Sequence, residues 1–256
     1  MAPPPFRSRL DAGEVLYSAW VTLPSADMAG ALARHGWDAV VIDMQHGYGD
    51  FADMRDGIAR IAAVGAAPVV RVGTGADELV GRALDSGALG LIRPMVNSGA
   101  QAASFAKACK YPPLGSRSWA PMRALDVLGM DRQAYLENAN DLVAGFAMVE
   151  TAEALENLDA ICATPGIDGI FVGPNDLSVS LTMGQAADPA RADVREALAH
   201  VAAKCGKAGL ASGIFANTPE MARIYREMDY RFIAVASDAK YLEAGSRGML
   251  EAVRER

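Results

Sequence analysis

The sequence predicts an α/β fold in which strands and helices alternate along the chain. The chain has 256 residues, of which 51% are hydrophobic, so it can bury a large core as one large domain or two small ones. Short, nearly continuous apolar runs recur, as expected of strands that helices cover on both faces. Between them, apolar residues repeat with the 3.6-residue period of a helix.

Eight strands and eight helices can be assigned in turn. The strands are predicted at residues 17–22, 39–43, 68–72, 90–94, 142–150, 167–172, 210–215 and 232–237. The helices are predicted at residues 26–35, 51–64, 78–85, 100–110, 152–163, 194–207, 219–228 and 241–253. Eight such units are typical of a (β/α)8 or TIM barrel. An open doubly wound sheet would need a GxGxxG-type turn after its first strand, and the sequence has none there.

Local signals mark the ends of these helices. Start signals stand at Ser25, Asp53, Thr151 and Thr218, and stop signals at Gly36, Gly65, Gly87 and Gly209. The long connection at residues 111–141, with a predicted helix at 131–140, is interpreted as a loop at the active-site end or a subunit contact. No linker or repeat divides the chain. We therefore expect a single barrel domain over residues 1–256, with residues 1–8 as a loose, proline-rich lead.

Composition excludes several classes of function. A net charge of −7 with no cluster of Lys or Arg argues against a nucleic-acid surface. No run of 18 apolar residues exists, and the N-terminus lacks the apolar region of a secretory signal, so no membrane segment is expected. Cys109, Cys162 and Cys205 form no C-x-x-C pair, and we interpret them as reduced thiols in a cytoplasmic protein.

Polar side chains follow the apolar runs at nearly every strand end. In a barrel of this type, chemistry takes place at the C-terminal ends of the strands. Trp20 and Thr22 end the first strand, where Trp20 is expected to line the mouth of the barrel. The other strand ends carry Asp43, His46, Arg71, Arg93, Asn97, Glu150, Asp176, Asn217, Ser237 and Asp238.

Glu150 and Asp176 lie at the ends of adjacent strands and allow two interpretations. Two carboxylates with open coordination positions suit a hard divalent ion such as Mg²⁺ or Mn²⁺. Alternatively, Glu150 belongs to the start of the next helix and Asp176 is an acidic residue in a first helical turn. Pro174 suits a first helical position, which leaves the N–H groups of Asn175 and Asp176 free to bind an anion. A metal ion shared with an acidic substrate would satisfy both features.

Three further residues are candidates for proton transfer and charge stabilisation. His46 is the histidine that stands at a strand exit, and its side chain suits a base near neutral pH. Arg71 ends a buried strand, so its guanidinium needs an anionic partner. It is either half of an internal ion pair or a clamp for a substrate oxygen. Asp85 could pair with His46 or Arg71.

At these residues the sequence resembles the HpcH/HpaI family of class II pyruvate aldolases. Four motifs carry the resemblance: GPNDLS at 173–178, IDMQH at 42–46, YPPLGSR at 111–117 and VET at 149–151. It covers essentially the whole chain. It implies a barrel that assembles as a hexamer, a trimer of dimers with the last helix exchanged between neighbours.

The resemblance also implies a reaction and a cofactor. The expected activity is a metal-dependent aldolase that reversibly cleaves 4-hydroxy-2-keto acids to pyruvate or hydroxypyruvate and an aldehyde. Glu150 and Asp176 match the residues that bind a divalent ion, Mg²⁺ or Mn²⁺, with Co²⁺, Ni²⁺ and Zn²⁺ as further candidates. A keto acid would chelate this ion.

Other positions match by their place in the motifs. His46 matches the base, Asp85 the acid that tunes it, and Arg71 the group that stabilises the enolate. The backbone of Asn175 and Asp176 matches the cradle for the substrate carboxylate. Trp20, Gly173 and Pro174 complete the expected substrate pocket.

The chain departs from the family pattern at several positions. Gln45 stands where Glu is common, Gly47-Tyr48 replaces a small residue and proline, and Met148 stands where Gln is common. Ser118-Trp119 follows Arg117 in place of the usual glycine. These changes leave the metal and the base in place and alter the part of the site that would face the aldehyde.

Three other functions compete with this one. A Schiff-base aldolase needs a lysine at the site, and of the five lysines only Lys240 is near a strand exit. An acyl-CoA lyase of the citrate lyase β type would want a basic groove, which this acidic chain does not indicate. A non-catalytic keto-acid-binding barrel would not need His46, Arg71 and Asp85 together.

Overall fold

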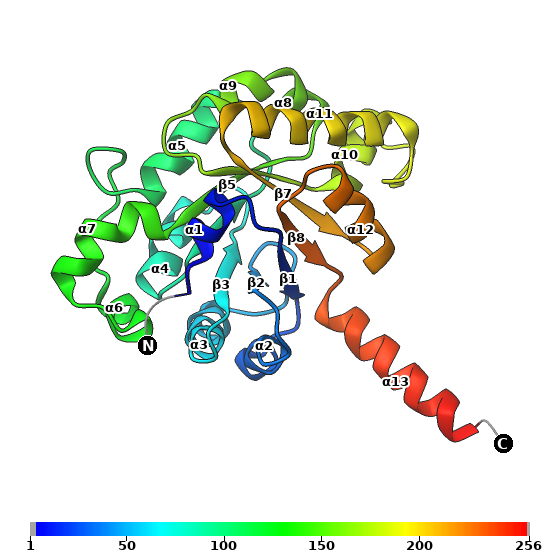
Figure 1. Ribbon diagram of the computed structural model, residues 1–256, viewed down its shortest axis with the longest axis horizontal. Helices are drawn as coiled ribbons and strands as arrows, with labels where there is room; N and C mark the ends of the chain where they lie inside the picture. Colours follow the sequence, from blue (N-terminus) through cyan, green and yellow to red (C-terminus); the bar gives the residue numbers. More distant parts are fainter. Residues whose placement is uncertain (1–3, 255–256) are drawn as a thin grey trace.

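The protein is a closed barrel of eight parallel strands, each hydrogen-bonded to the next in chain order, with β1 paired to β8 (Figure 1). The computed structural model describes residues 4–254, excluding the side chain at position 77. The strands are β1 Leu16–Val21, β2 Ala39–Asp43, β3 Ala67–Arg71, β4 Gly90–Arg93, β5 Ala144–Val149, β6 Gly169–Val172, β7 Ala211–Ala216 and β8 Phe232–Val235. The predicted (β/α)8 barrel is confirmed.

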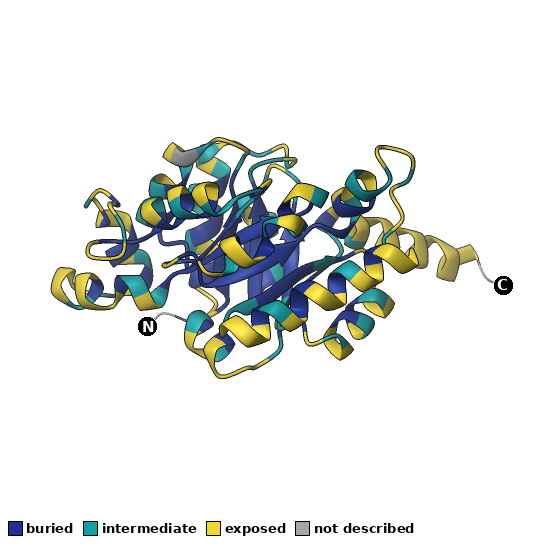
Figure 2. Cartoon of the chain, turned by 90° about the horizontal axis from the view of Figure 1, so that it is seen from above, coloured by how far each residue is buried: buried dark blue, intermediate teal, exposed yellow. Residues whose placement is uncertain are grey.

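Helices surround the barrel and leave their outer faces exposed (Figure 2). They are α1 Phe6–Asp11, α2 Ala26–Ala33, α3 Phe51–Ala62, α4 Asp77–Asp85, α5 Gly99–Cys109, α6 Met122–Leu128, α7 Arg132–Leu142, α8 Ala152–Glu156, α9 Leu158–Cys162, α10 Pro174–Leu181, α11 Ala192–Ala208, α12 Pro219–Glu227 and α13 Asp238–Arg254. The predicted helix at 152–163 is two short helices that meet at Asn157. The cap of α3 is Asp50, and Asp53 is the third residue of its capping box.

Aromatic side chains fill the inside of the barrel. Phe146 packs against Phe171 and Phe232, and Trp20 lies 6.0 Å from Phe171 between ring centroids. Gly169 makes room for this packing, because a Cβ there would lie 2.5 Å from the Phe146 ring. The lumen is therefore a packed core that closes the floor of any site above it.

Helix α1 corrects the prediction of a loose lead over residues 1–8. Phe6 is 2% exposed and packs edge-on against Phe232 at 5.2 Å, while Arg7 donates to the Asp168 carboxylate at 2.5 Å. The helix therefore covers the N-terminal end of the barrel, and burial of one aromatic ring offsets the poor helix-forming tendency of the prolines before it. Residues 1–3 lie outside the described residues.

The long connection at residues 111–141 is more ordered than predicted. Besides α7 it contains α6, which packs against α3 and α4. Buried Arg117 lies over the rings of Tyr111 and Tyr135 and donates to the Tyr135 hydroxyl. Cation–π contacts of this kind fix the connection on the side of the barrel.

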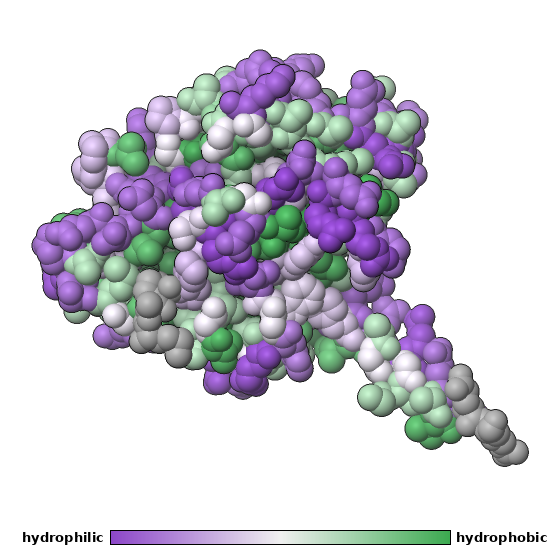
Figure 3. Space-filling view, in the orientation of Figure 1, coloured by the Kyte–Doolittle hydropathy of each residue, from purple (hydrophilic) through white to green (hydrophobic). Residues whose placement is uncertain are grey.

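Helix α13 projects away from the barrel (Figures 1 and 3). Its root is held by Tyr241, which stacks on Trp37 at 5.9 Å. Beyond the root it exposes large apolar side chains: Leu242, Met249, Leu250 and Val253. No helix in the described part of the chain is both long enough and apolar enough to span a bilayer.

Candidate active site

A pocket of about 270 Å³ opens at the C-terminal ends of the strands. It is lined by Trp20, Thr22, Asp43, His46, Arg71, Met148, Gly173, Pro174, Asn175, Asp176, Phe215 and Ser237. Most of the residues predicted for the site are among them. The lining combines charged and polar groups with the apolar side chains of Trp20, Met148 and Phe215.

Arg71 is held in the pocket by a carboxylate on the neighbouring strand. Its Nε and Nη2 donate to the two oxygens of Asp43 at 2.9 and 2.5 Å, and its guanidinium lies 4.8 Å from the centre of the Trp20 ring. Burial of Asp43 acts to raise its pKa, but the guanidinium outweighs this and holds the pKa of Asp43 below its usual range. Arg71 is thus both an internal ion-pair partner and a pocket residue, which joins the two interpretations of the sequence.

Asp43 also shapes the turn that presents His46. Its Oδ1 accepts hydrogen bonds from the backbone N–H groups of Gln45 at 3.0 Å and His46 at 3.2 Å. Gly47 follows, and a Cβ there would lie 2.1 Å from the Asp43 carbonyl oxygen. The turn is therefore tight, and it places an exposed His46 at the rim of the pocket beside Arg71.

Glu150 is a buried residue, 2% exposed, that lies behind the pocket wall formed by Gly173. Its Oε1 accepts a hydrogen bond from the N–H of Met95 at 2.8 Å. Burial and the negative charge of Asp176 together raise the pKa of Glu150 to about 7, although the Met95 N–H and Arg71 act to lower it. Two carboxylates therefore act on each other at this edge, as predicted from their adjacent strand ends.

The wall next to Glu150 has to be glycine. A Cβ on Gly173 would lie 2.4 Å from the Glu150 Oε2 and 2.7 Å from the Met148 side chain. The missing side chain lets the second carboxylate oxygen approach the start of α10, where Asp176 lies in the first turn. The local sequence Gly173-Pro174 thus brings the two acids into one site.

This donor set fits a divalent cation. A cation between Glu150 and Asp176 would relieve their repulsion, and hard carboxylate oxygens are the ligands that Mg²⁺ and Mn²⁺ prefer. Within residues 4–254 no group of three or more His, Cys, Asp or Glu gathers. The ion would therefore have two protein carboxylates and open positions for substrate oxygens and water.

The first turn of α10 offers N–H groups to the same pocket. Gly173 is its N-cap and makes no side-chain cap, and Pro174 is its first residue, as predicted. The N–H groups of Asn175 and Asp176 then have no carbonyl one turn earlier to bond. The Asn217 amide donates to Asn175 Oδ1 at 3.1 Å, which turns the Asn175 side chain away from its own backbone. The turn can accept a carboxylate of the substrate.

Asp85 lies apart from this group within the chain, and its expected pairing with His46 or Arg71, as the acid that tunes His46, stays a prediction. Its Oδ1 accepts from Arg117 Nη2 at 2.7 Å, in a separate hollow on the side of the barrel. Burial raises the pKa of Asp85 although Arg117 lowers it. The sequence could not indicate this partner, because Arg117 comes from the long connection after α5.

Sequence reasoning also missed groups that organise the site. Asp43 was visible at a strand end, and the parallel register that pairs Asp43 with Arg71 could have revealed it. Met95 could not be predicted from its residue type, because it contributes the backbone N–H that donates to Glu150. This N–H belongs to a residue with a backbone φ of 55°. Phe215 and Ser237 were within or beside predicted strands and gave no chemical pattern.

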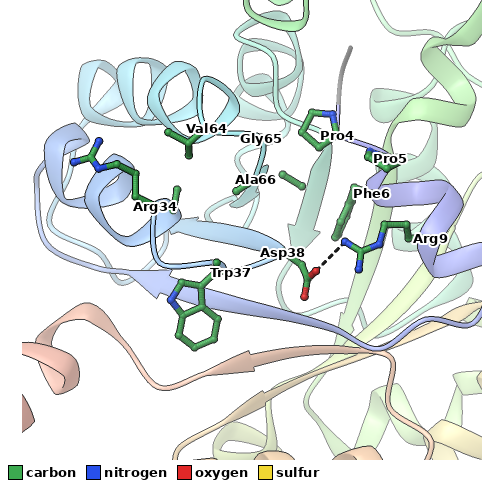
Figure 4. Close-up of a pocket in the computed structure, with 13 residues that line it drawn as sticks. Pro4, Pro5, Phe6, Arg9, Arg34, Trp37, Asp38, Val64, Gly65 and Ala66 are labelled. Atoms are coloured by element: carbon green, nitrogen blue, oxygen red, sulfur yellow. Dashed lines mark hydrogen bonds and ion pairs between the residues drawn. The ribbon is translucent and has the colours of Figure 1, made fainter. Parts of the chain in front are cut away.

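A second hollow lies at the opposite end of the barrel (Figure 4). It lies between Pro4–Phe6 and the ends of α2 and α3. Arg9 crosses it to Asp38 at 2.8 Å, a contact drawn in the figure. Among the described residues that line it, Asp38 is the one carboxylate and there is no histidine, so the hollow at the other end of the barrel offers more of the groups that a reaction needs.

Comparison with known proteins finds relatives that match nearly the whole chain. A family model described as HpcH/HpaI aldolase/citrate lyase matches residues 16–244. A hydroxypyruvate/pyruvate aldolase of Rhizorhabdus wittichii is 38% identical over 97% of this chain and 98% of its own length. A 2-dehydro-3,6-dideoxy-6-sulfogluconate aldolase of Pseudomonas putida is 36% identical over 93% and 92%. A crystal structure of a protein of the same family from Burkholderia cenocepacia superposes with a TM-score of 0.90, at 39% identity, over 98% of this chain and 100% of that one.

Proposed function

The chain belongs to the HpcH/HpaI aldolase/citrate lyase family and is an aldolase, and we propose that it uses a divalent metal ion to cleave 4-hydroxy-2-keto acids reversibly to pyruvate or hydroxypyruvate and an aldehyde. One observation carries this proposal. His46, Arg71 and the first turn of α10 line a single pocket directly above the Glu150 carboxylate. That combination supplies a base, a cation and an anion cradle beside a candidate metal site.

The keto acid binds through its carboxylate in this proposal. The N–H groups of Asn175 and Asp176 hold the carboxylate, while Gly173 and Pro174 form the adjoining wall. Trp20 covers the opposite side. Because the floor is packed and apolar, the substrate is held at the mouth and water is excluded from below it.

Glu150 and Asp176 would hold the metal ion. The ion would be Mg²⁺ or Mn²⁺, with Co²⁺, Ni²⁺ or Zn²⁺ as alternatives, and it would polarise the keto group so that an enolate forms at lower cost. The HpcH/HpaI aldolases are generally dependent on such an ion, which agrees with the donor set here.

The reacting atoms meet Arg71 and His46. Arg71, fixed by Asp43, places positive charge near the oxygen on which negative charge develops, a term typically worth about 3 kcal/mol. His46 at the rim takes the proton of the 4-hydroxyl in cleavage and returns it in condensation. The aldehyde therefore leaves on the open side of the pocket, past His46 and Tyr48.

No lysine lines the pocket among the described residues, which disfavours a Schiff-base route. Lys110 is buried and donates to the carbonyls of Asn140 and Val143, and Lys240 pairs with Glu243 on α13. Borohydride treatment in the presence of pyruvate is expected to leave the mass of the protein unchanged. A stable adduct would replace the metal mechanism with the covalent one.

The direct test is aldol cleavage with and without metal. EDTA is expected to abolish cleavage of a 4-hydroxy-2-keto acid, Mn²⁺ or Mg²⁺ to restore it, and His46→Ala to lower turnover by about 100-fold or more. His200→Ala, on helix α11, is the matched control and is expected to keep full activity. Full activity in chelator would exclude the metal.

We further propose that the enzyme is a homo-hexamer, a trimer of dimers held by exchange of α13. The helix exposes Leu242, Met249, Leu250 and Val253 well away from its own barrel, and such a surface is costly in water (Figure 3). Light scattering is expected to give six times the chain mass. Leu250→Glu with Met249→Glu is expected to yield smaller species, and a wild-type monomer would rule the arrangement out.

A further inference from the structure

Asp238 is a buried acid that the proposed mechanism does not use. It is the first residue of α13 and is 0% exposed. Two residues earlier, Ala236 has a φ of 54°, a left-handed conformation that is unfavourable for a residue with a side chain. This bend redirects the chain after β8, so that Ser237 lines the pocket. A strained backbone at a strand exit calls for an explanation in function.

The Asp238 carboxylate is bonded mainly to the exit of β1. Its Oδ1 accepts from the N–H and the hydroxyl of Thr22 at 3.0 and 2.8 Å, and its Oδ2 accepts from the N–H of Leu23 at 3.0 Å. Its own helix supplies the N–H of Ala239 at 2.9 Å. A buried carboxylate is stable when donors of this kind surround it. Three of the four donors lie on the segment that lines the mouth.

Thr22 in turn holds the turn that carries His46. Its carbonyl accepts from the N–H of Tyr48 at 2.8 Å. Gly47 lies close to the backbone of both Asp43 and Thr22. A Cβ on Gly47 would be 2.1 Å from the Asp43 carbonyl oxygen and 3.3 Å from the Thr22 carbonyl oxygen. The turn is thus fixed by Asp43 on one side and by Thr22 on the other.

We propose that Asp238 is a positioning residue for His46: through Thr22 it holds the turn at 45–48 in the place where the imidazole can reach the substrate. The inference rests on the proposed function, because it assigns Asp238 to the proton transfer of that reaction. Asp43 positions the start of the turn together with Arg71, and Asp238 positions its end. Because Asp238 also begins α13, the same carboxylate joins the catalytic turn to the helix proposed to bind a neighbouring subunit.

Asp238→Asn is the informative variant. The amide keeps the shape of the side chain but cannot accept at its nitrogen, so at least one N–H or O–H of the β1 exit loses its partner. Misplacement of a catalytic group by about 1 Å can cost 100-fold in rate. We expect kcat to fall by about 10- to 100-fold while KM for the keto acid changes by less than about threefold, because the N–H groups of Asn175 and Asp176 that would bind its carboxylate lie on α10, outside this loop.

A double-mutant cycle separates positioning from general damage. If Asp238 acts through His46, Asp238→Asn costs little in a His46→Ala background, where the imidazole is already absent. If its role is merely structural, the two losses multiply. Asp193→Asn is the matched control, since Asp193 also lies in the first turn of its helix but is 47% exposed and pairs with Arg191. It is expected to keep wild-type turnover.

A measurement without substrate keeps this inference distinct from the proposed function. Amide hydrogen exchange of the metal-free protein is expected to be faster over residues 44–50 in Asp238→Asn and unchanged there in Asp193→Asn. Unchanged exchange over 44–50 overturns the positioning role, whatever reaction the enzyme catalyses. Faster exchange combined with no aldol cleavage by the wild type would uphold the mechanical link and refute the proposed function.

A milder variant covers the case in which Asp238→Asn fails to fold. Thr22→Val removes the shortest hydrogen bond to the carboxylate and keeps the size of the side chain. It is expected to show the same two changes, faster exchange over 44–50 and a lower kcat, with smaller amplitude. Wild-type exchange and turnover in Thr22→Val would contradict the proposal.

Discussion

The two ends of the barrel treat buried charge in opposite ways. At the N-terminal end, Lys110 is 1% exposed and pairs with Asp168 at 2.7 Å, and Asp168 also accepts from Arg7 and from the Gly145 N–H. At the C-terminal end, Glu150 is equally buried but has the negative charge of Asp176 as a neighbour. The N-terminal end pairs its buried charges, whereas the C-terminal end, besides the ion pair of Asp43 and Arg71, holds two neighbouring carboxylates whose repulsion a ligand would relieve.

This difference shows how one scaffold divides stability from chemistry. Paired charges at the N-terminal end cost little and fix α1, α5 and the long connection to the strands. The repulsion between Glu150 and Asp176 at the mouth is tolerated because the packed aromatic core of the barrel stabilises the fold without any contribution from these two residues. Variants at one end of the barrel therefore test whether the other end responds.

Glu150→Gln is expected to have the largest effect, in opposite directions on activity and stability. Activity should fall by about 1000-fold or more, because a ligand of the proposed metal is lost. The folded-state pKa of Glu150 lies near 7, above the value of 4.5 for a free side chain. The Glu150 carboxyl therefore contributes fully to the free energy of unfolding below about pH 4.5, and this contribution is lost as pH rises through 7.

The stability half of this prediction is measured in EDTA. The melting temperature of Glu150→Gln should exceed that of the wild type at pH 8 by several degrees, and the two should converge at pH 5. Lower stability of the variant at pH 8 would mean that the carboxylate is not strained in the metal-free protein. The contrast between the two ends would then disappear.

Lys110→Met is the corresponding change at the satisfied end. It leaves the buried Asp168 without its more deeply buried cation and two carbonyls without a donor, which is expected to cost about 3–5 kcal/mol in the free energy of unfolding. Urea unfolding measures this cost. Below the melting temperature kcat and KM should stay at wild-type values.

Lys107→Met is the matched control for that variant. Lys107 lies on the same helix, α5, but is exposed, so its loss should change the free energy of unfolding by less than about 0.5 kcal/mol. Equal costs for the two lysines would show that the Lys110 network is not special. A large loss of kcat in Lys110→Met would show that the two ends are coupled.

Asp43→Asn affects the mouth through the position of Arg71. The variant loses a bidentate ion pair and part of the support of the His46 turn, so kcat should fall by about 10- to 100-fold. Because the pKa of Asp43 is held below its usual value, its contribution to stability is present above about pH 4 and is lost as pH falls further. Thermal melts from pH 7 to pH 3 should show the gap between wild type and variant closing in acid.

The sequence predicts the barrel well because buried parallel strands appear as continuous apolar runs. Residues 39–43 were placed to the residue, and the other strands shift by a few positions at their ends. Helix α1 was not predicted. A short segment after three prolines is not expected to form a helix by itself, and here it depends on the packing of Phe6 against Phe232. The same holds for α6, which depends on contacts with α3 and α4.

For the site, the sequence predicts the chemical groups better than their partners. His46, Arg71, Glu150 and Asp176 come together because all strand ends in a closed parallel barrel share one rim. The sequence suggests His46 or Arg71 as the partner of Asp85, which ends the helix after Arg71, whereas within the chain its carboxylate accepts from Arg117. Met95 and Asp238 act through backbone geometry and through hydrogen bonds between distant segments, and neither leaves a pattern in the sequence.

Arg7→Met is expected to have the smallest effect on the free energy of unfolding, and it tests how far the charge of Asp168 is neutralised at the N-terminal end. Arg7 is 23% exposed and is one of two cations on Asp168, so Lys110 still neutralises the buried carboxylate when Arg7 is gone. The expected cost is about 1 kcal/mol in urea unfolding, well below that of Lys110→Met. Combining the two variants should cost more than the sum of the single losses, because only then is Asp168 buried without any cation. A strictly additive result would mean that water reaches Asp168, and the N-terminal end would then owe its stability to apolar contacts such as Phe6 with Phe232.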